Sequence, residues 1–172
     1  MSDDLELARA WPYQRGFAAV GLFKPGDSSN VGGALRAAYV YGAQLVAIAS
    51  PRGRAADGIK HAANTVRGWK HIPTLVADDL RELVPFDCIP IAVDLLDDAI
   101  ALPDYQHPAR AFYIFGPENG TLGRNITDWC AHRIMVPTRV CMNLAATVNV
   151  VLYDRIAKAM LSAKRERKVD VA

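Results

Sequence analysis

The sequence predicts a single α/β domain built on a parallel sheet flanked by helices. Short apolar runs alternate with helical segments along almost the whole chain, as in sheets whose strands are joined by crossover helices. The length of 172 residues suits one domain with a substantial core. The hydrophobic fraction of 51% and the charged fraction of 22% are those of an ordinary globular protein.

The chain begins with a polar extension, residues 1–16, which is expected to lie outside the core. Phe17–Phe23 is an apolar run that predicts the first strand. The loop after it is rich in Pro, Gly, Asp and Ser, and Ser29 or the Asn that follows can cap a helix. That helix is predicted over Val31–Tyr41, ended by a glycine. Gln44–Ala49 predicts the second strand.

The middle of the chain has weaker helical signals and one clear strand. An Asp can cap a short helix over Asp57–Val66, and Asp78–Val84 suits a helix of one or two turns. An extended piece is expected near His71. Cys88–Val93 is a clear apolar run and predicts a strand that ends at Asp94.

The last third completes the sheet. Ala111–Phe115 and Arg133–Val136 predict two strands, with a helix over Leu122–Cys130 between them. A long apolar helix is predicted over Asn143–Ala163. The predicted organisation is therefore an extension over 1–16, one globular domain over 17–163 and a basic tail over 164–172.

Two polar loops follow the strands of the last third, and both contain Gly, Pro or Asn. The first is Gly116-Pro-Glu-Asn-Gly120, and the second runs from Pro137 to Asn143. Ligands of open parallel sheets bind outside the carboxyl ends of the strands, so we expect these loops to form two walls of one pocket. The alternative is that both are ordinary turns, since Gly and Pro punctuate any such connection.

The start of the first helix carries a second candidate group. Arg36 follows Asn30 by nearly two helical turns, so its guanidinium can fold back toward the loop after the first strand. A fixed cation beside exposed backbone N–H groups suits a phosphate or another anion. The alternative is a capped helix whose Arg forms a surface ion pair.

Several other kinds of site are disfavoured. The Gly32-Gly33 pair lacks the spacing of a dinucleotide-binding loop, and Gly116–Gly120 lacks the Lys-Ser/Thr of a phosphate loop. The four histidines and three cysteines show no metal-ligand spacing, and the cysteines suggest structural thiols in a reducing cytoplasm. We expect no signal peptide, no membrane-spanning segment and no metal.

A basic segment over residues 52–71 predicts contact with a nucleic acid, although the net charge of +2 alone would not. Its cations are Arg52, Arg54, Lys60, Arg67 and Lys70, against a single acidic residue. Trp69 lies among them, and such a segment can follow a phosphate backbone and stack on a base. The alternative is a solvated helix face.

Three motifs in order resemble those of the SpoU (TrmH-like) group of SPOUT RNA methyltransferases. The first is Asn-x-Gly-x-x-x-Arg after the first strand, matched by Asn30, Gly32 and Arg36. The second is a strand ending in Phe-Gly-x-Glu-x-x-Gly or a similar run, which Phe115-Gly-Pro-Glu118 and Gly120 resemble. The third is a strand ending in Ile/Val-Pro followed by a helix start, matched by Val136-Pro137 and Cys141-Met-Asn-Leu144. Together they cover roughly residues 17–160.

The resemblance implies methyl transfer from S-adenosylmethionine to a ribose 2′-hydroxyl of RNA, in a homodimer whose C-terminal part forms a trefoil knot. It implies catalytic roles for Arg36, helped by Asn30, Glu118 and Asn143. The implied donor-binding residues lie in three loops: Ala92, Val93, Asp94, Gly116, Pro117, Glu118, Val136, Cys141, Met142, Asn143 and Leu144. RNA contacts are expected from Arg36, Arg52, Arg54, Lys60 and Arg67.

Among the family, the chain most resembles the short TrmL-like members that methylate the wobble ribose of tRNA. It departs from them at Asn119-Gly-Thr121, in a shorter loop after Pro137, and at Cys141, where they have Ser. We therefore expect a cytoplasmic enzyme acting on tRNA. Two other readings remain open, namely the same reaction on ribosomal RNA and a non-catalytic RNA-binding member. A flavodoxin-like small-molecule protein is disfavoured because its phosphate loop is missing.

Overall fold

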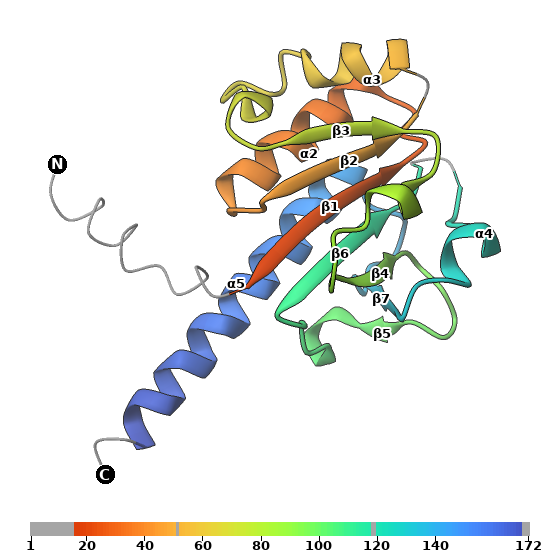
Figure 1. Ribbon diagram of the computed structural model, residues 1–172. Helices are drawn as coiled ribbons and strands as arrows, with labels where there is room; N and C mark the ends of the chain where they lie inside the picture. Colours follow the sequence, from red (N-terminus) through yellow and green to blue (C-terminus); the bar gives the residue numbers. More distant parts are fainter. Residues whose placement is uncertain (1–15, 51, 118–119, 170–172) are drawn as a thin grey trace, which may run out of the picture.

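The computed structural model describes residues 16–50, 52–117 and 120–169, and only the backbone of residues 52–54 and 164–169 (Figure 1). It contains a seven-stranded sheet in the order β3-β2-β1-β6-β4-β7-β5, and every pairing is parallel. The strands are β1 (Phe17–Phe23), β2 (Leu45–Ala49), β3 (Thr74–Ala77), β4 (Ile89–Val93), β5 (Ile100–Ala101), β6 (Arg110–Phe115) and β7 (His132–Met135). The predicted fold class is confirmed.

Helices cover both faces of the sheet (Figure 1). The α-helices are α2 (Ser28–Val40), α3 (Arg52–Ile59), α4 (Arg124–Thr127) and α5 (Leu144–Val169), and the 3₁₀ turns are η2 (Gly68–Lys70), η3 (Leu80–Leu83) and η4 (Leu102–Asp104). No helix among the described residues is long and apolar enough to cross a membrane. The trefoil knot stays a prediction.

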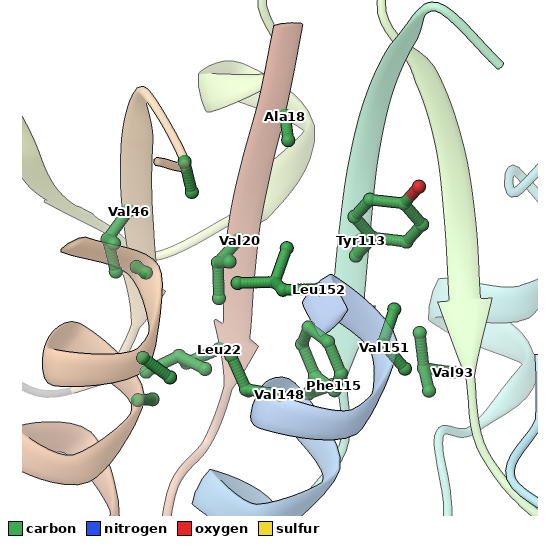
Figure 2. Packing of buried hydrophobic residues seen from close by; sticks show 14 of the residues in the cluster. Ala18, Val20, Leu22, Val46, Val93, Tyr113, Phe115, Val148, Val151 and Leu152 are labelled. Atoms are coloured by element: carbon green, nitrogen blue, oxygen red, sulfur yellow. The ribbon is translucent and has the colours of Figure 1, made fainter. Parts of the chain in front are cut away.

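The core has two layers because alternate side chains of each strand point to opposite faces. Val20 and Leu22 of β1 pack beneath α2 and α5, and Figure 2 shows them with Val148 and Leu152 of α5. Ala19 of the same strand belongs to the second layer. That layer is closed by Leu80 of η3 and by residues of the α4 region, including Ile126.

The start of α2 differs from the prediction. Asp27 is the N-cap, and its Oδ1 accepts a hydrogen bond of 2.7 Å from the backbone N–H of Ser29. That bond holds the pKa of the Asp27 carboxyl below its ordinary value. Prediction placed the cap at Ser29 or Asn30, but Asp is an equally good cap and comes first in the chain. Asn30 consequently lies inside the first turn, where it is buried.

The middle of the chain contains the largest errors of prediction. The helix predicted over Asp57–Val66 is wrong, because α3 begins at Arg52 and ends at Ile59. The extended piece expected near His71 lies slightly later, as β3. The predicted helix over Asp78–Val84 is the 3₁₀ turn η3, capped by Asp79. Both β5 and η4 were not predicted, since a two-residue strand has no detectable period.

The last two helices differ from prediction in length. The helix predicted over Leu122–Cys130 is a single turn, α4, which begins only after Gly123. The final helix continues past Ala163 to Val169, and its end projects beyond the sheet (Figure 1). The basic residues of 164–169 thus extend the helix, although their side chains lie outside the described residues.

A polar network ties α5 to the amino end of the sheet. His107, whose side chain is only 5% exposed, lies between the hydroxyl of Tyr113 at 2.7 Å and Asp154 Oδ2 at 2.9 Å. Arg155 donates to the same hydroxyl and to the carbonyls of Pro108 and Ala109. With that hydroxyl already accepting from Arg155, its proton is free for Nδ1 of a neutral His107. Neutral His107 can still donate from Nε2 to Asp154.

We expect this network to make stability depend on pH. Burial lowers the pKa of His107 below its ordinary value, against the opposing effect of Asp154. The unfolded chain then binds a proton at His107 more tightly than the folded chain does. The contribution of neutral His107 to the free energy of unfolding is therefore complete above about pH 6.5 and is lost as the pH falls further. Urea unfolding at several pH values should show that the free energy of unfolding decreases more steeply with falling pH in the wild type than in His107→Gln. Equal slopes would contradict this account.

Candidate functional site

A pocket of about 500 Å³, counted out to its open side, lies at the carboxyl ends of β4, β6 and β7 and beside the start of α5. Most of the predicted donor-binding residues line it: Val93, Asp94, Gly116, Pro117, Val136, Cys141, Met142 and Leu144. The expectation that the two polar loops form walls of one pocket is therefore met by the geometry. Its position is that of a small-molecule site in an open parallel sheet.

The other three predicted donor-site residues are placed differently. Ala92 is fully buried behind the pocket, where it packs in the second core layer. Asn143 lies between two lining residues but does not itself line the pocket. Glu118 lies outside the described residues.

Asp94 joins the loops that form the pocket. Its Oδ1 accepts a hydrogen bond of 2.7 Å from the N–H of Leu95, and its Oδ2 accepts one of 2.5 Å from the N–H of Leu122. Its own backbone N–H donates to the carbonyl of Ile134 in β7. Both carboxylate oxygens thus accept hydrogen bonds from the protein backbone. Through the bond to Leu122, Asp94 holds the loop after β6 against the end of β4.

The walls of the pocket are largely apolar. Val93, Phe115 and Leu144 are at most 4% exposed and present hydrocarbon or aromatic surface at the pocket. Thr147, one turn into α5, completes the wall, and its hydroxyl already donates to the Asn143 carbonyl at 3.0 Å. Such walls suit a flat, weakly polar group such as a nucleobase, with specificity left to loop backbone groups.

The start of α5 is joined to the start of α2. Asn143 Nδ2 donates to Asn30 Oδ1 at 2.6 Å, across 113 positions of sequence. The helices approach closely here, because a Cβ added to Gly33 would lie 2.8 Å from the Cβ of Ala145. Gly33 is thus required by close packing. The contact places the first motif beside the third.

Asn143 also caps α5, since its Oδ1 accepts the N–H of Ala146 at 3.2 Å. We expect Asn143→Ala to lower the free energy of unfolding by about 1–2 kcal/mol, because both the cap and the bond to Asn30 are lost. Asn143→Ser keeps a capping oxygen and loses only the bond to Asn30, so its loss of free energy should be smaller. Chemical denaturation of the three proteins checks the order. Equal losses in the two variants would show that the cap contributes nothing.

Arg36 lies on α2 beyond Asn30, and its side chain is exposed. Among the described residues it has no ion pair or hydrogen bond, and it does not line the pocket of this single chain. The predicted surface ion pair is therefore not formed with any described residue. The guanidinium remains available to a ligand or to a second chain.

The predicted RNA-binding cations divide into two groups. Lys60 and Arg67 line a second pocket, in the segment that packs against α2 at Gly32. Arg52 and Arg54 belong to α3, but their side chains lie outside the described residues. No group of three His, Cys, Asp or Glu side chains that could hold a metal occurs in the described part of the chain.

Some pocket residues were missed by sequence reasoning. Leu95 and Thr147 line the donor-side pocket but belong to no motif, and Thr138 lies in the predicted loop over Pro137–Asn143 without having been singled out. Thr147 carries a usable signal, since it lies three residues after Leu144 on the same helix face. Leu95 and Thr138 lie in irregular loops, where no periodicity of the sequence indicates which way a side chain points.

Comparison with known proteins identifies relatives of this chain. A model of the SpoU rRNA Methylase family matches residues 18–153. A sequence comparison with curated proteins found no match.

Solved structures share the fold at low sequence identity. An rRNA methyltransferase from Sinorhizobium meliloti superposes with a TM-score of 0.70 at 18% identity, covering 82% of this chain and 56% of that one. The SpoU methyltransferase AviRb from Streptomyces viridochromogenes superposes with a TM-score of 0.72 at 15% identity, covering 94% of this chain and 66% of that one. A TrmH/SpoU tRNA modifying enzyme from A. aeolicus superposes with a TM-score of 0.73 at 13% identity, covering 93% of this chain and 85% of that one. This chain thus spans 56% to 66% of the length of the first two. AviRb has also been solved in complex with AdoMet.

Proposed function

We propose that this chain, which belongs to the SpoU rRNA methylase family, transfers a methyl group from S-adenosylmethionine to a ribose 2′-hydroxyl of RNA. The observation that carries the proposal is the meeting of the second and third motifs around one pocket, with the first motif joined to them through Asn30 and Asn143. Binding of AdoMet by AviRb, which has the same fold, supports the choice of donor.

The pocket fits such a donor. Its apolar walls, formed by Val93, Phe115 and Leu144, suit an adenine ring, and the loop at Gly116 and Pro117 offers backbone groups beside it. When bound, the donor supplies a methyl group activated by a positively charged sulfonium. Glu118, in the same loop by sequence, would favour that charge electrostatically.

Arg36 is the residue we assign to the ribose. Arginine stays protonated in proteins, so it serves as an electrostatic stabiliser of the oxygen that becomes nucleophilic. A substrate phosphate or water would then take the hydroxyl proton. Holding the hydroxyl in line with the methyl group would provide much of the rate. Asn30 and Asn143, hydrogen-bonded to each other, fix the start of α2, the helix that carries Arg36.

A homodimer would complete this site. The contact between α2 and α5 presents exposed apolar side chains, among them Val40 at 56% and Tyr153 at 61% exposure. The ring of Tyr153 lies 6.4 Å from that of Tyr41, the C-cap of α2, so apolar surface of the two helices meets there. A contiguous apolar surface of this kind is typical of a contact between copies of a chain. It lies on the helix that carries Arg36, which could therefore reach the donor pocket of a partner.

We place tRNA ahead of ribosomal RNA as the substrate, on the resemblance to the short wobble-ribose enzymes. The likeness in fold to a tRNA modifying enzyme from A. aeolicus is compatible with either, since rRNA methyltransferases share it equally. Incubation with methyl-labelled S-adenosylmethionine and size-fractionated RNA tests the choice. Label in the tRNA fraction is expected. Label confined to ribosomal RNA would favour the second candidate, and no label in any fraction would contradict the proposed reaction.

A further inference from the structure

A second pocket, of about 650 Å³ counted out to its open side, lies in the segment that packs against α2 at Gly32. Its lining includes Lys60, Arg67 and Trp69, which come from the irregular segment between α3 and β3. We propose that this pocket binds one unpaired nucleotide of the RNA substrate, next to the target nucleotide. Its base would stack on Trp69, and its phosphate would contact Arg67 and Lys60. The inference rests on the proposed function.

The segment is fixed in shape although η2 is its only regular element among the described residues. Successive turns are closed by backbone hydrogen bonds from His61 to Gly58 at 3.2 Å, from Asn64 to His61 at 3.0 Å, and from Arg67 to Asn64 at 2.9 Å. A fourth joins Lys70 to Arg67 at 2.8 Å. These bonds fix the backbone on which the side chains of the pocket are carried. The pocket is therefore largely formed before any ligand arrives.

Asn64 holds the segment from within. It is 4% exposed, its Oδ1 accepts the N–H of Gly68 at 2.9 Å, and its Nδ2 donates to the carbonyl of Ile59 at 3.3 Å. Arg67 has a φ of 48°, a left-handed conformation that residues other than glycine adopt infrequently. Strained backbone of this kind is concentrated at ligand sites. Here it fixes the direction from which Arg67 and Trp69 leave the backbone.

The lining has the chemistry of a nucleotide site. Lys60 and Arg67 are exposed cations, and no carboxylate lines the pocket among the described residues. Trp69 is 37% exposed, and the ammonium of Lys70 lies 5.4 Å from the centroid of its ring. Base–aromatic stacking together with phosphate contacts is the usual mode of single-strand binding. A duplex offers no free base face, so the geometry favours an unpaired nucleotide.

The position of this pocket relates it to the proposed ribose site. A Cβ added to Gly32 would lie 3.1 Å from the Cβ of His61 and 3.3 Å from the backbone N of Asn64. The segment thus packs directly on the turn of α2 that holds Asn30. Arg36 follows Gly32 by four residues, so both lie on one face of the helix. An RNA strand with its ribose at Arg36 would therefore pass this pocket.

The test measures binding of a fluorescein-labelled, mixed-sequence single-stranded RNA decamer, and of the blunt duplex formed with its complement, in the absence of donor. Trp69→Ala should weaken single-strand binding about 10- to 100-fold, and Trp69→Phe should restore most of it. Arg67→Gln should lower the slope of log affinity against log salt by about 0.7, the value of one single-strand phosphate contact. Arg81→Gln is the control for charge: Arg81 lies in η3, whose Leu80 packs in the second core layer, and it pairs with Asp79 outside the pocket. Thermal melting verifies that each variant is folded.

The outcomes are distinguishable from those of the proposed reaction. Equal binding of single strand by the wild type and the folded Trp69 variants would overturn the subsite, even if methyl transfer to RNA occurs normally. Tighter binding of the duplex than of the single strand by the wild type would overturn it as well. A selective loss in Trp69→Ala supports the subsite, whether or not the wild type transfers a methyl group. Absence of transfer by the wild type contradicts the proposed function alone.

Discussion

Replacing Arg36 with alanine is expected to reduce methyl transfer to RNA by about 100- to 1000-fold, the usual cost of losing one group that stabilises a developing oxyanion. The affinity for S-adenosylmethionine should stay nearly unchanged, because Arg36 is exposed on α2 and does not line the donor pocket of its own chain. Single-turnover transfer assays and calorimetry with the donor measure the two effects separately.

Arg36→Lys is the informative companion variant. Lysine keeps the charge but lacks the planar fork of donors, so it should recover only a part of the lost rate. Because the side chain is exposed, neither variant should unfold the protein. Near-normal transfer by Arg36→Ala would remove Arg36 from the reaction. A loss of donor affinity equal to the loss of rate would place it in donor binding instead.

The second large effect is expected from Thr147→Trp. Thr147 lies in the first turns of α5 and faces the donor pocket, so an indole at this position would fill space that the donor needs. We expect donor affinity to fall by more than about 100-fold, which corresponds to about 2.7 kcal/mol. Calorimetry with S-adenosylmethionine checks this, and thermal melting verifies that the variant is folded.

Thr147→Val separates occlusion from the loss of the hydroxyl. Valine has the shape of threonine but cannot donate to the Asn143 carbonyl, a bond of 3.0 Å in this structure. Its effect on donor affinity should be small beside that of tryptophan. If the tryptophan variant binds the donor as tightly as the wild type, the donor binds elsewhere and the assignment of this pocket is wrong.

The parts of the fold that the sequence predicts well are those with strong local signals. Long apolar runs between turn-forming residues gave β1, β2 and β6 to within one residue at each end. Such runs are buried on both faces of a parallel sheet, so their boundaries coincide with changes of composition. The short β5 has no such signal, and its pairing with β7 depends on tertiary structure.

Helix boundaries were harder to predict because several residues compete as caps. Asp27, Ser29 and Asn30 are all good N-caps, and only the structure shows that the first is used. Asp57 lies inside α3, although an Asp at this position was predicted to cap the start of a helix. Beyond α3, successive turns replace the predicted helix, because the buried Asn64 binds backbone groups on both sides.

The loops of the candidate site could be predicted from the sequence, but the contacts that join them could not. Motifs indicated which loops matter, and the loops meet around one pocket. The bond between Asn30 and Asn143 spans 113 positions, so no local pattern could show it. The same holds for the carboxylate of Asp94, which accepts the backbone N–H of Leu122, 28 positions away in the sequence.

The most direct test of the proposed function is the chemical identity of the product. RNA treated with the wild-type protein and methyl-labelled S-adenosylmethionine can be digested to nucleosides and separated by chromatography with mass detection. We expect the label in a 2′-O-methylated nucleoside, with the methyl group on the ribose fragment, and no such product with Arg36→Ala. Label on a base, or unlabelled RNA under conditions in which the protein binds the donor, would contradict the account.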